Sequence, residues 1–445
     1  MPRYIRHFSI PTVISKGDIA PDNPNKAWDA AMPEFPATNK CDLSEFRDLI
    51  TEDEVRSLVK RVLGCNAVLR DHYLQPYSNG KLGYLGSHLR LCVKVQVNDR
   101  QESLHFFVKV VPYDVPTQAE YVLAKGVFAQ EAAFYREIMP ELRKDHNGKP
   151  WAAECHLVKK DLLVFEDLGL KGYTMRNKCF DRDQVLEGLS ALARLHAASL
   201  IAEARLGKSL KRMFPHAFKE KAFSPTGKTF KWFDVGINAA EAIAKDLGLQ
   251  PAFLRVACKR IYDGLQESPT KANVVCHGDL WANNLLFSND VSPKCLIVDF
   301  QLLRYAPLAH DIAQFLYLCT DRSFRQTWER RMLEHYYRVL TDILKSSQNP
   351  VKVPSWSEIV EGMEEQRLSA LITAVIYFPT VLMDEERAAQ IMTDPAGYSE
   401  YVFQDRTNTT MENMKRDKEF GARIAESVTE LVEMSFKLDE LPKPC

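Results

Sequence analysis

The sequence predicts an α+β protein in which a strand-rich part precedes a helix-rich part. Hydrophobic residues alternate with polar ones over residues 89–97, a period of two that is typical of a strand. From residue 184 onward, hydrophobic residues recur at helical spacing in several long segments. Because strands and helices are segregated along the chain, an α+β architecture is favoured over a doubly wound sheet. The 445 residues suffice for two lobes or two to three domains.

Composition sets limits on partners and compartment. The chain is 46% hydrophobic and 26% charged, as in ordinary globular proteins. A net charge of −1 gives no reason to expect nucleic acid or an anionic membrane as a partner. The ten cysteines are scattered, without a C-x-x-C motif, so we expect free thiols in a reducing compartment and no zinc site.

The sequence gives no signal for a membrane span or a targeting segment. The N-terminus has no continuous apolar core of a signal peptide, and the longest apolar stretch, residues 368–383, is interrupted and too short to cross a bilayer. We therefore expect no membrane span and a cytoplasmic location.

The first part of the chain is expected to form an arm and a nucleotide-binding lobe. Residues 1–44 are rich in proline and aperiodic, which predicts an extended N-terminal arm. Residues 45–168 are expected to form the N-lobe. Its predicted elements are a helix over 43–62, a glycine-punctuated loop over 78–87, strands at 89–97 and 104–111, a helix over 119–138 that Pro140 stops, and strands at 155–159 and 162–165.

Residues 169–440 are expected to form a helical C-lobe that carries the catalytic loop and the substrate pocket. Its helical patterns lie at 184–202, 251–266, 308–319, 324–345, 357–378 and 419–437. One short buried strand is expected at 295–298.

The most informative segment of this lobe runs from His277 to Asn284. Its H-x-D-x-x-x-x-N spacing offers Asp279 as a base for a substrate hydroxyl and Asn284 as a metal ligand. Asp299 follows the apolar run 295–298, and a carboxylate beside an amide oxygen suits Mg²⁺. The alternative is a surface loop in which the aspartate and asparagine only form turns.

Lys109 and Glu131 are the candidate phosphate clamp. Lys109 lies within a predicted strand between apolar residues, and alone it would read as an edge lysine that reaches solvent. A strand lysine paired with a glutamate of the next helix instead holds the α- and β-phosphates in kinases. Glu131 is preferred as that partner over Glu120 and Glu137 of the same helix.

Two further segments are candidates for nucleotide contact. Gly80, Gly83 and Gly86, followed by Ser87, could offer backbone N–H groups to phosphates, although their G-x-x-G-x-x-G spacing differs from the kinase motif and also suits a simple turn. Glu166 to Leu168 leaves the last predicted strand and is the candidate hinge for an adenine edge.

Two residues near the catalytic loop are expected to act structurally. His277 is expected to support the loop by packing and hydrogen bonding. Asp311 is either an acid at the start of a helix or a brace for the loop.

These motifs resemble the ecdysteroid kinase-like family, also called CHK kinase-like, of the choline kinase and aminoglycoside phosphotransferase superfamily. The matching segments are His277-Gly278-Asp279-Leu280-Trp281-x-x-Asn284, Asp299-Phe300-Gln301-x-x-Arg304, Lys109 in its strand, Glu131-x-x-Phe134-Tyr135, Glu166-Asp167-Leu168 and Leu192-Ala193-x-Leu195-His196-Ala197. The resemblance covers roughly residues 45–435. It implies a two-lobed protein-kinase-like fold, with a small antiparallel sheet in the N-lobe and a large helical C-lobe.

The resemblance also implies an activity. ATP and Mg²⁺ would bind in the cleft, and the acceptor would be a hydroxyl of a small molecule, with ecdysteroids and foreign alcohols or phenols as the suggested classes. Gly278 and Gln301 stand where protein kinases have arginine and glycine, which agrees with this family.

A protein substrate is not expected. Asp311 follows Asp299 by only twelve positions, which leaves no room for an activation segment. The apolar stretch 368–383 suggests instead a largely hydrophobic small-molecule pocket.

Two other functions remain open from the sequence. A choline- or aminoglycoside-type kinase would need acids or aromatic residues for a cationic acceptor, and Asp384-Glu385-Glu386 and Tyr401 are available. A nucleotide-binding pseudokinase is disfavoured because Lys109, Asp279, Asn284 and Asp299 are all present.

Overall fold

The computed structural model describes residues 49–78, 86–98, 100–113, 115–145 and 148–444. The expected arm over residues 1–44, the first residues of the first expected helix, and Gly80 and Gly83 lie outside the described residues. The description below therefore concerns one compact unit that begins at Phe46.

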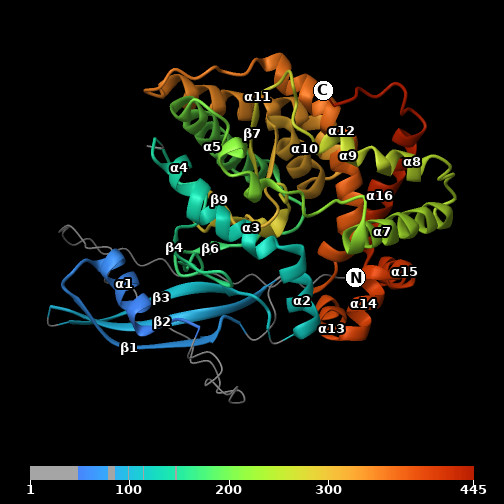
Figure 1. Ribbon diagram of the computed structural model, residues 1–445. Coiled ribbons are helices and arrows are strands. Elements are labelled where there is room, and N and C mark those ends of the chain that lie inside the picture. Colours follow the sequence, from blue (N-terminus) through green and yellow to red (C-terminus); the bar gives the residue numbers. More distant parts are fainter. Residues whose placement is uncertain (1–48, 79–85, 99, 114, 146–147, 445) are drawn as a thin grey trace, which may run out of the picture. The chain divides into compact units, whose positions relative to one another are not determined.

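An antiparallel five-stranded sheet forms the first part of this unit, as predicted (Figure 1). Its strands pair in the order β1-β2-β3-β5-β4. Helix α1 begins after Thr51, whose side chain and that of Glu54 form a capping box, and its apolar residues lie against the sheet. The bounds are α1 Glu52–Leu63, β1 Ala67–Pro76, β2 Ser87–Val97, β3 Arg100–Val110, β4 Cys155–Val158 and β5 Leu162–Glu166.

The helix expected over residues 119–138 is divided into several pieces. Gly126 adopts a left-handed conformation (φ 70°) and ends α2, Pro116–Lys125. Helix α3, Val127–Ala133, then passes into a π-helical turn, η2, Phe134–Ile138. The prediction that Pro140 ends the helix is wrong. Pro140 lies in the first turn of α4, Met139–Arg143, where the missing N–H of proline is tolerated.

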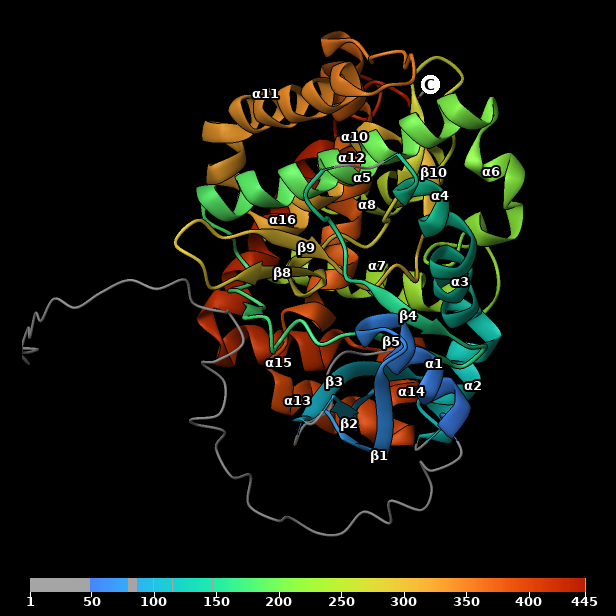
Figure 2. The same ribbon diagram turned by 90° about the vertical axis from the view of Figure 1, so that its left-hand side faces the viewer.

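The second part of the unit is mainly helical and contains most of the hydrophobic core. Figure 2 shows the long helix α5, Arg182–Leu206, lying between α11 and strand β9. The other helices are α6 Leu210–Met213, η3 Pro215–Phe218, α7 Gly227–Asp246, α8 Leu254–Lys259, α9 Ile261–Gly264, α10 Leu308–Cys319, α11 Arg322–Ser346, α12 Trp356–Val381, α13 Glu385–Thr393, α14 Pro395–Phe403, α15 Thr407–Arg416 and α16 Lys418–Ser435.

Strands also occur in this helical part, where one was expected. They form a three-stranded sheet in the order β6-β8-β9 and a two-stranded sheet of β10 and β7. The expected strand over 295–298 is β9. The bounds are β6 Tyr173–Thr174, β7 Asn273–Cys276, β8 Leu285–Ser288, β9 Cys295–Ile297 and β10 Arg304–Pro307, and η4, Ala282–Asn284, lies between β7 and β8. These strands are too short for a periodic signal, but they fix both ends of the segment that carries Asp279.

One described helix, α5, is long and apolar enough to cross a membrane, but 78% of its most apolar window is buried inside the protein. A core helix of this length has the same composition. The interrupted apolar stretch, residues 368–383, forms most of the second half of α12 and is also largely buried.

The packing of α5 on α10 requires a glycine. A Cβ at Gly188 would lie 2.6 Å from the Cζ atom of Phe315, which is a steric overlap. We expect Gly188→Ala to lower the free energy of unfolding by about 1–3 kcal/mol, as overpacked cores do. Helix propensity alone predicts the opposite, a stabilisation of about 1 kcal/mol, because alanine favours a helix more than glycine does. The sign of the measured change therefore distinguishes the two effects.

Urea unfolding measures this change. The double variant Gly188→Ala/Phe315→Leu should lose less than the sum of the two single variants, because the smaller side chain leaves room for the methyl group. A neutral or stabilising Gly188→Ala would contradict the predicted contact.

Candidate active site

The ammonium group of Lys109 joins the five-stranded sheet to the segment after β9. Its Nζ atom lies 2.6 Å from Oε2 of Glu131 and 2.7 Å from Oδ1 of Asp299. Lys109 and Glu131 are buried, and the Asp299 side chain retains 28% of its exposure. The structure therefore brings together the three residues that the sequence placed far apart, and Glu131, rather than Glu120 or Glu137, is the helix partner.

The two carboxylates determine the charge of this lysine. Burial alone would lower the pKa of Lys109, but Asp299 and Glu131 outweigh burial and raise the pKa above its usual range. Lys109 is therefore protonated at neutral pH, and an ammonium group is a strong hydrogen-bond donor to phosphate oxygens.

Helix α3 is fixed to the rest of the site beside Glu131. The Gln130 amide donates to the carbonyl oxygens of Ala217 at 2.7 Å and Leu303 at 3.1 Å. The ring of Phe134, one turn further along, stacks on Phe300 with centroids 4.2 Å apart. The position of Glu131 therefore depends on the segment that begins at Asp299.

Gly86 and Ser87 are the described part of the predicted glycine loop, and both lie near Lys109. A Cβ at Gly86 would lie 3.4 Å from Cε of Lys109, and Ser87 pairs with Val110 in the sheet. Their role in phosphate contact stays a prediction.

The predicted hinge has two of its backbone groups engaged within the protein. The amide of Glu166 donates to the carbonyl oxygen of Glu154, and the carbonyl oxygen of Leu168 accepts from Lys171 and Tyr173. An adenine edge would have to use other backbone groups of this segment. Between them, Asp167 accepts from Tyr77 at 2.8 Å and Arg90 at 3.1 Å, which fixes the hinge to the sheet.

Two side chains of α10 hold the catalytic loop. Asp311 accepts the backbone N–H groups of His277 at 2.6 Å and Gly278 at 3.0 Å. Gln314 accepts from the amide of Leu280 at 2.8 Å and donates to the carbonyl of Gly278 at 3.1 Å. Asp311 therefore braces the loop, one of the two roles that the sequence left open.

Gly278 is required at its position. Its φ of 76° is left-handed, and a Cβ would lie 2.1 Å from the carbonyl oxygen of Leu302. An arginine, the residue of protein kinases, has no room here.

Arg304 and Glu220 support the loop from a second direction, and the sequence-based site did not include them. Nη1 of Arg304 donates to the Gly278 carbonyl at 2.7 Å, while Nε and Nη2 bind the two carboxylate oxygens of Glu220 at 2.7 and 3.0 Å. Arg304 could have been found from the sequence, because it belongs to the motif that begins at Asp299. Glu220 could not, because it lies in an irregular segment without a recognisable pattern.

His277 is a neutral structural residue, as predicted. Its Nδ1 accepts from the amide of Asp279 at 3.2 Å, so the proton lies on Nε2, which donates to the carbonyl of Val298 at 2.9 Å. Burial lowers the pKa of His277, consistent with the neutral form. The ring also meets Phe300 edge-on at 4.7 Å.

Asp279 is buried and only partly satisfied. Its Oδ2 accepts from Nδ2 of Asn284 at 3.2 Å, and Oδ1 has no hydrogen-bond partner among the described residues. Burial and the nearby Asp299 raise the pKa of Asp279 to about 7, against the opposing charges of Arg304 and Lys125. A carboxylate with such a pKa can accept a proton near neutral pH.

The oxygen atoms of this region fit a divalent cation. Nδ2 of Asn284 donates to Asp279, so the side-chain oxygen of Asn284 is the atom that could bind a cation. Asp299 and the unpartnered Oδ1 of Asp279 add carboxylate oxygens. Mg²⁺ prefers oxygen ligands of this kind. Asp299 itself has a left-handed φ of 68°, a conformation that costs an ordinary residue about 1–2 kcal/mol.

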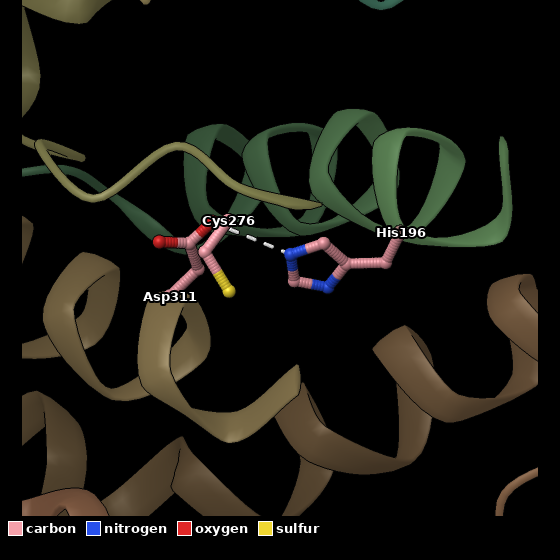
Figure 3. A group of neighbouring side chains, drawn as sticks. All are labelled: His196, Cys276 and Asp311. Atoms are coloured by element: carbon pink, nitrogen blue, oxygen red, sulfur yellow. Dashed lines mark hydrogen bonds and ion pairs between the residues drawn. The ribbon is translucent and has the colours of Figure 1, made fainter. Parts of the chain in front are cut away.

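A second group of potential ligands, His196, Cys276 and Asp311, lies behind the loop (Figure 3). His196 contacts Oδ2 of Asp311 at 3.3 Å and the hydroxyl of Tyr336 at 2.7 Å, and the Cys276 thiol donates to backbone carbonyls of β10 and its end. Although burial would raise the pKa of Asp311, His196 and the other nearby histidines hold it at about 2. These polar atoms are engaged in supporting the loop.

The raised pKa of Asp279 gives a prediction for the ligand-free protein. Because its folded-state pKa of about 7 exceeds the ordinary value of 3.8, folding becomes less favourable as the pH rises between these values. The penalty is absent below the lower value and complete above the higher one.

We therefore expect Asp279→Asn to stabilise the protein relative to the parent, by an amount that grows between pH 5 and pH 7 at up to about 1.4 kcal/mol per pH unit. Denaturant unfolding at several pH values measures it, with Asp246→Asn, an exposed carboxylate of α7, as the control. A stability difference independent of pH would contradict the buried, perturbed carboxylate.

Comparisons with known proteins give three kinds of match. An uncharacterized kinase-like protein of Caenorhabditis elegans is 28% identical over 165 residues, which are 36% of this chain and 41% of that relative. The chain thus matches less than half of the relative's length.

The solved structures that the chain matches include Plasmodium vivax ethanolamine kinase, with 14% identity, a TM-score of 0.39, and coverage of 85% of this chain and 87% of that one. Choline kinase LicA of Streptococcus pneumoniae is matched with 12% identity, a TM-score of 0.35, and coverage of 81% and 99%.

The family model is the decisive match. The model of the ecdysteroid kinase-like family matches residues 82–349, a segment that runs from the glycine loop through β10 to the end of α11. This segment is more than half of the chain and contains Lys109, Glu131, Asp279, Asn284 and Asp299. The chain therefore belongs to the ecdysteroid kinase-like family.

Proposed function

We propose that the protein is an ATP- and Mg²⁺-dependent phosphotransferase that phosphorylates a hydroxyl group of a small molecule, an ecdysteroid or a foreign alcohol or phenol. The observation that carries the proposal is the meeting of Lys109, Glu131 and Asp299 within 2.7 Å, beside the buried Asp279. Phosphoryl transfer needs positioning and charge neutralisation more than covalent help, and these residues supply both.

Each residue has a role in the proposed reaction. Lys109, held by Glu131, neutralises the α- and β-phosphates of ATP. The acceptor hydroxyl donates its proton to Asp279, its oxygen forms a bond to the γ-phosphorus, and the bond to the β-phosphate oxygen breaks, so that ADP leaves. The brace formed by Asp311, Gln314 and Arg304 keeps Asp279 in place during this exchange.

Asn284 and Asp299 would hold Mg²⁺. When bound, the ion neutralises developing charge on the phosphates. The ion would also compensate the negative charges of Asp279 and Asp299. Burial is the main cause of the raised pKa of Asp279, and repulsion by Asp299 is the second.

The described contacts of the residues proposed for a cationic acceptor favour the alcohol reading. Asp384 caps α13 and pairs with Arg416 at 2.9 Å, and the Tyr401 hydroxyl donates to the carbonyl of Pro379 at 2.7 Å. These groups serve the packing of the C-terminal helices. A cytoplasmic location belongs to the same proposal, and the eight described cysteines, all free thiols, support it.

Asp279→Asn tests the base. Asparagine keeps the shape and the contact with Asn284 but cannot accept the proton, so turnover should fall by about 10²- to 10⁴-fold. Mass spectrometry of a panel of ecdysteroids, phenols, choline and aminoglycosides with MgATP measures the product, and the variant should still bind ATP. Undiminished turnover in this variant would exclude Asp279 as the base, and failure of the parent to bind MgATP would overturn the proposed function.

Asp299→Ala tests the metal. Removal of this ligand should raise the Mg²⁺ concentration needed for half-maximal turnover by about 10-fold or more, since a hard-oxygen site loses one of its charged ligands. Asp290→Ala, an exposed carboxylate of the β8–β9 turn, is the matched control. An unchanged Mg²⁺ dependence with full activity would sink the assignment of Asp299.

A further inference from the structure

An aromatic cluster lies directly against the catalytic loop. Arg304, which donates to the carbonyl of Gly278, has its Cζ atom 5.9 Å from the ring centre of Phe223. Phe223 stacks on Tyr377 of α12, with centroids 6.3 Å apart and planes at 19°. Trp232 of α7 contacts both rings, at 5.9 and 5.8 Å. Phe223, Trp232 and Tyr377 form the cluster to which the following paragraphs refer.

Lys125 brings a positive charge to this cluster. Its Nζ atom lies 5.8 Å from the Trp232 ring centre and 5.3 Å from that of Tyr121, and it donates to the Tyr121 hydroxyl at 3.2 Å. Lys125 is half-buried at the end of α2 and forms no ion pair with a carboxylate of the described residues. Figure 1 shows that α2, α7 and α14 lie near one another, and Tyr121 packs on Phe403 of α14.

A second cation beside Trp232 is buried and incompletely paired. Arg406 is 1% exposed, and its Cζ atom lies 5.7 Å from the Trp232 ring centre. Its Nη2 donates to the Trp232 carbonyl at 3.1 Å, while Nε and Nη1 are buried without a hydrogen-bond partner among the described residues. A buried guanidinium is costly unless an anion or other acceptor satisfies it.

Lys221 adds to the positive charge at the same place. Its Nζ atom would lie 3.0 Å from a Cβ built on Gly126, the residue after Lys125. Burial and the charges of Lys219 and Lys125 lower the pKa of Lys221. Lys125, Lys221 and the buried Arg406 therefore bring positive charge to this region.

Two carboxylates near the cluster have other roles. Asp279 and Glu220 are among the groups whose charges act on Tyr377. Glu220 is bound by Arg304 at both oxygens, and Asp279 is the proposed base. The faces of Trp232 and Tyr121 that could attract a ligand cation already have cations of the chain near them.

We infer that the acceptor is an aromatic or polycyclic alcohol that carries an anionic group, and that Lys125 selects it by pairing with that group. The aromatic cluster provides the flat apolar contact, and Arg406 and Lys221 provide the positive field that disfavours cationic acceptors such as quaternary amines. This inference rests on the proposed function, because it assigns the acceptor of the same reaction.

Three naphthalene compounds with one hydroxyl group each test the charge preference: 6-hydroxy-2-naphthoate, 2-naphthol and (6-hydroxy-2-naphthyl)trimethylammonium. Binding in the presence of MgATP is measured by calorimetry, and phosphorylation by mass spectrometry. We expect the naphthoate to bind at least about 10-fold more tightly than naphthol, and the ammonium compound to bind more weakly than naphthol, as charge complementarity requires.

Lys125→Met should remove the preference for the naphthoate while binding of naphthol changes little. Lys231→Met, an exposed lysine of α7 beside Trp232 in sequence, is the matched control and should retain the preference. Because Lys125 is half-buried and forms no ion pair with the described residues, its variant is expected to fold, and a thermal melt verifies this.

The outcomes separate the two proposals. Equal or tighter binding of the ammonium compound, or an unchanged preference in folded Lys125→Met, would overturn the charge selection and leave the kinase proposal standing. Naphthoate binding that depends on Lys125, without phosphorylation of any of the three compounds or of the wider panel, would support the selection and contradict the kinase.

Discussion

The contact of Lys109 with Glu131 and Asp299 is the interaction on which the site depends. It joins a strand of the five-stranded sheet, helix α3 and the segment after β9, which are separated by 22 and 190 positions along the chain. Asp299 contacts the lysine from a left-handed conformation, so its ion pair helps to offset a backbone cost. A change in any of these three elements would move a charge that ATP is proposed to meet.

The catalytic loop is fixed by neutral and charged groups that do not depend on modification. Asp311 accepts the N–H groups of His277 and Gly278, and Gln314 bonds the backbone on both sides of Asp279. Arg304 donates to the Gly278 carbonyl, which also accepts from Gln314. Gly278 makes this closeness possible because no side chain fits against Leu302. The loop is thus held ready by the packing of α10 and β10, and an activation segment has no place in it.

The sequence predicted those parts of the fold that have a strong period or a motif. Strands β2 and β3, helices α5, α10 and α12, and the pairing of Lys109 with Glu131 follow from alternation, helical spacing and kinase-like spacing. Helix α7 has a weak signal because Gly236 interrupts its pattern. That glycine is needed because Arg406 and Ile376, both far away in the chain, pack against it: a Cβ there would lie 2.2 Å from Nη2 of Arg406 and 2.7 Å from Cδ1 of Ile376. The break between α2 and α3 could have been predicted from Gly126. The π-helical turn and the left-handed conformation of Asp299 could not, because tertiary contacts impose them.

The contrast between sequence motifs and tertiary contacts also explains why one side of the site could be predicted and the other could not. The proposed phosphate side consists of charged residues at kinase-like spacing, as expected if ATP and Mg²⁺ present the same atoms to every such enzyme. The acceptor side is built from Tyr121, Trp232 and Tyr377 on three separate helices, and no spacing connects them. Its chemistry is instead visible in two cations beside aromatic faces: Lys125 forms no ion pair with the described residues, and two nitrogen atoms of the buried Arg406 have no hydrogen-bond partner among them. Since a folded chain satisfies its buried charges wherever it can, such an imbalance next to the proposed base is best explained by a ligand that supplies the missing anion.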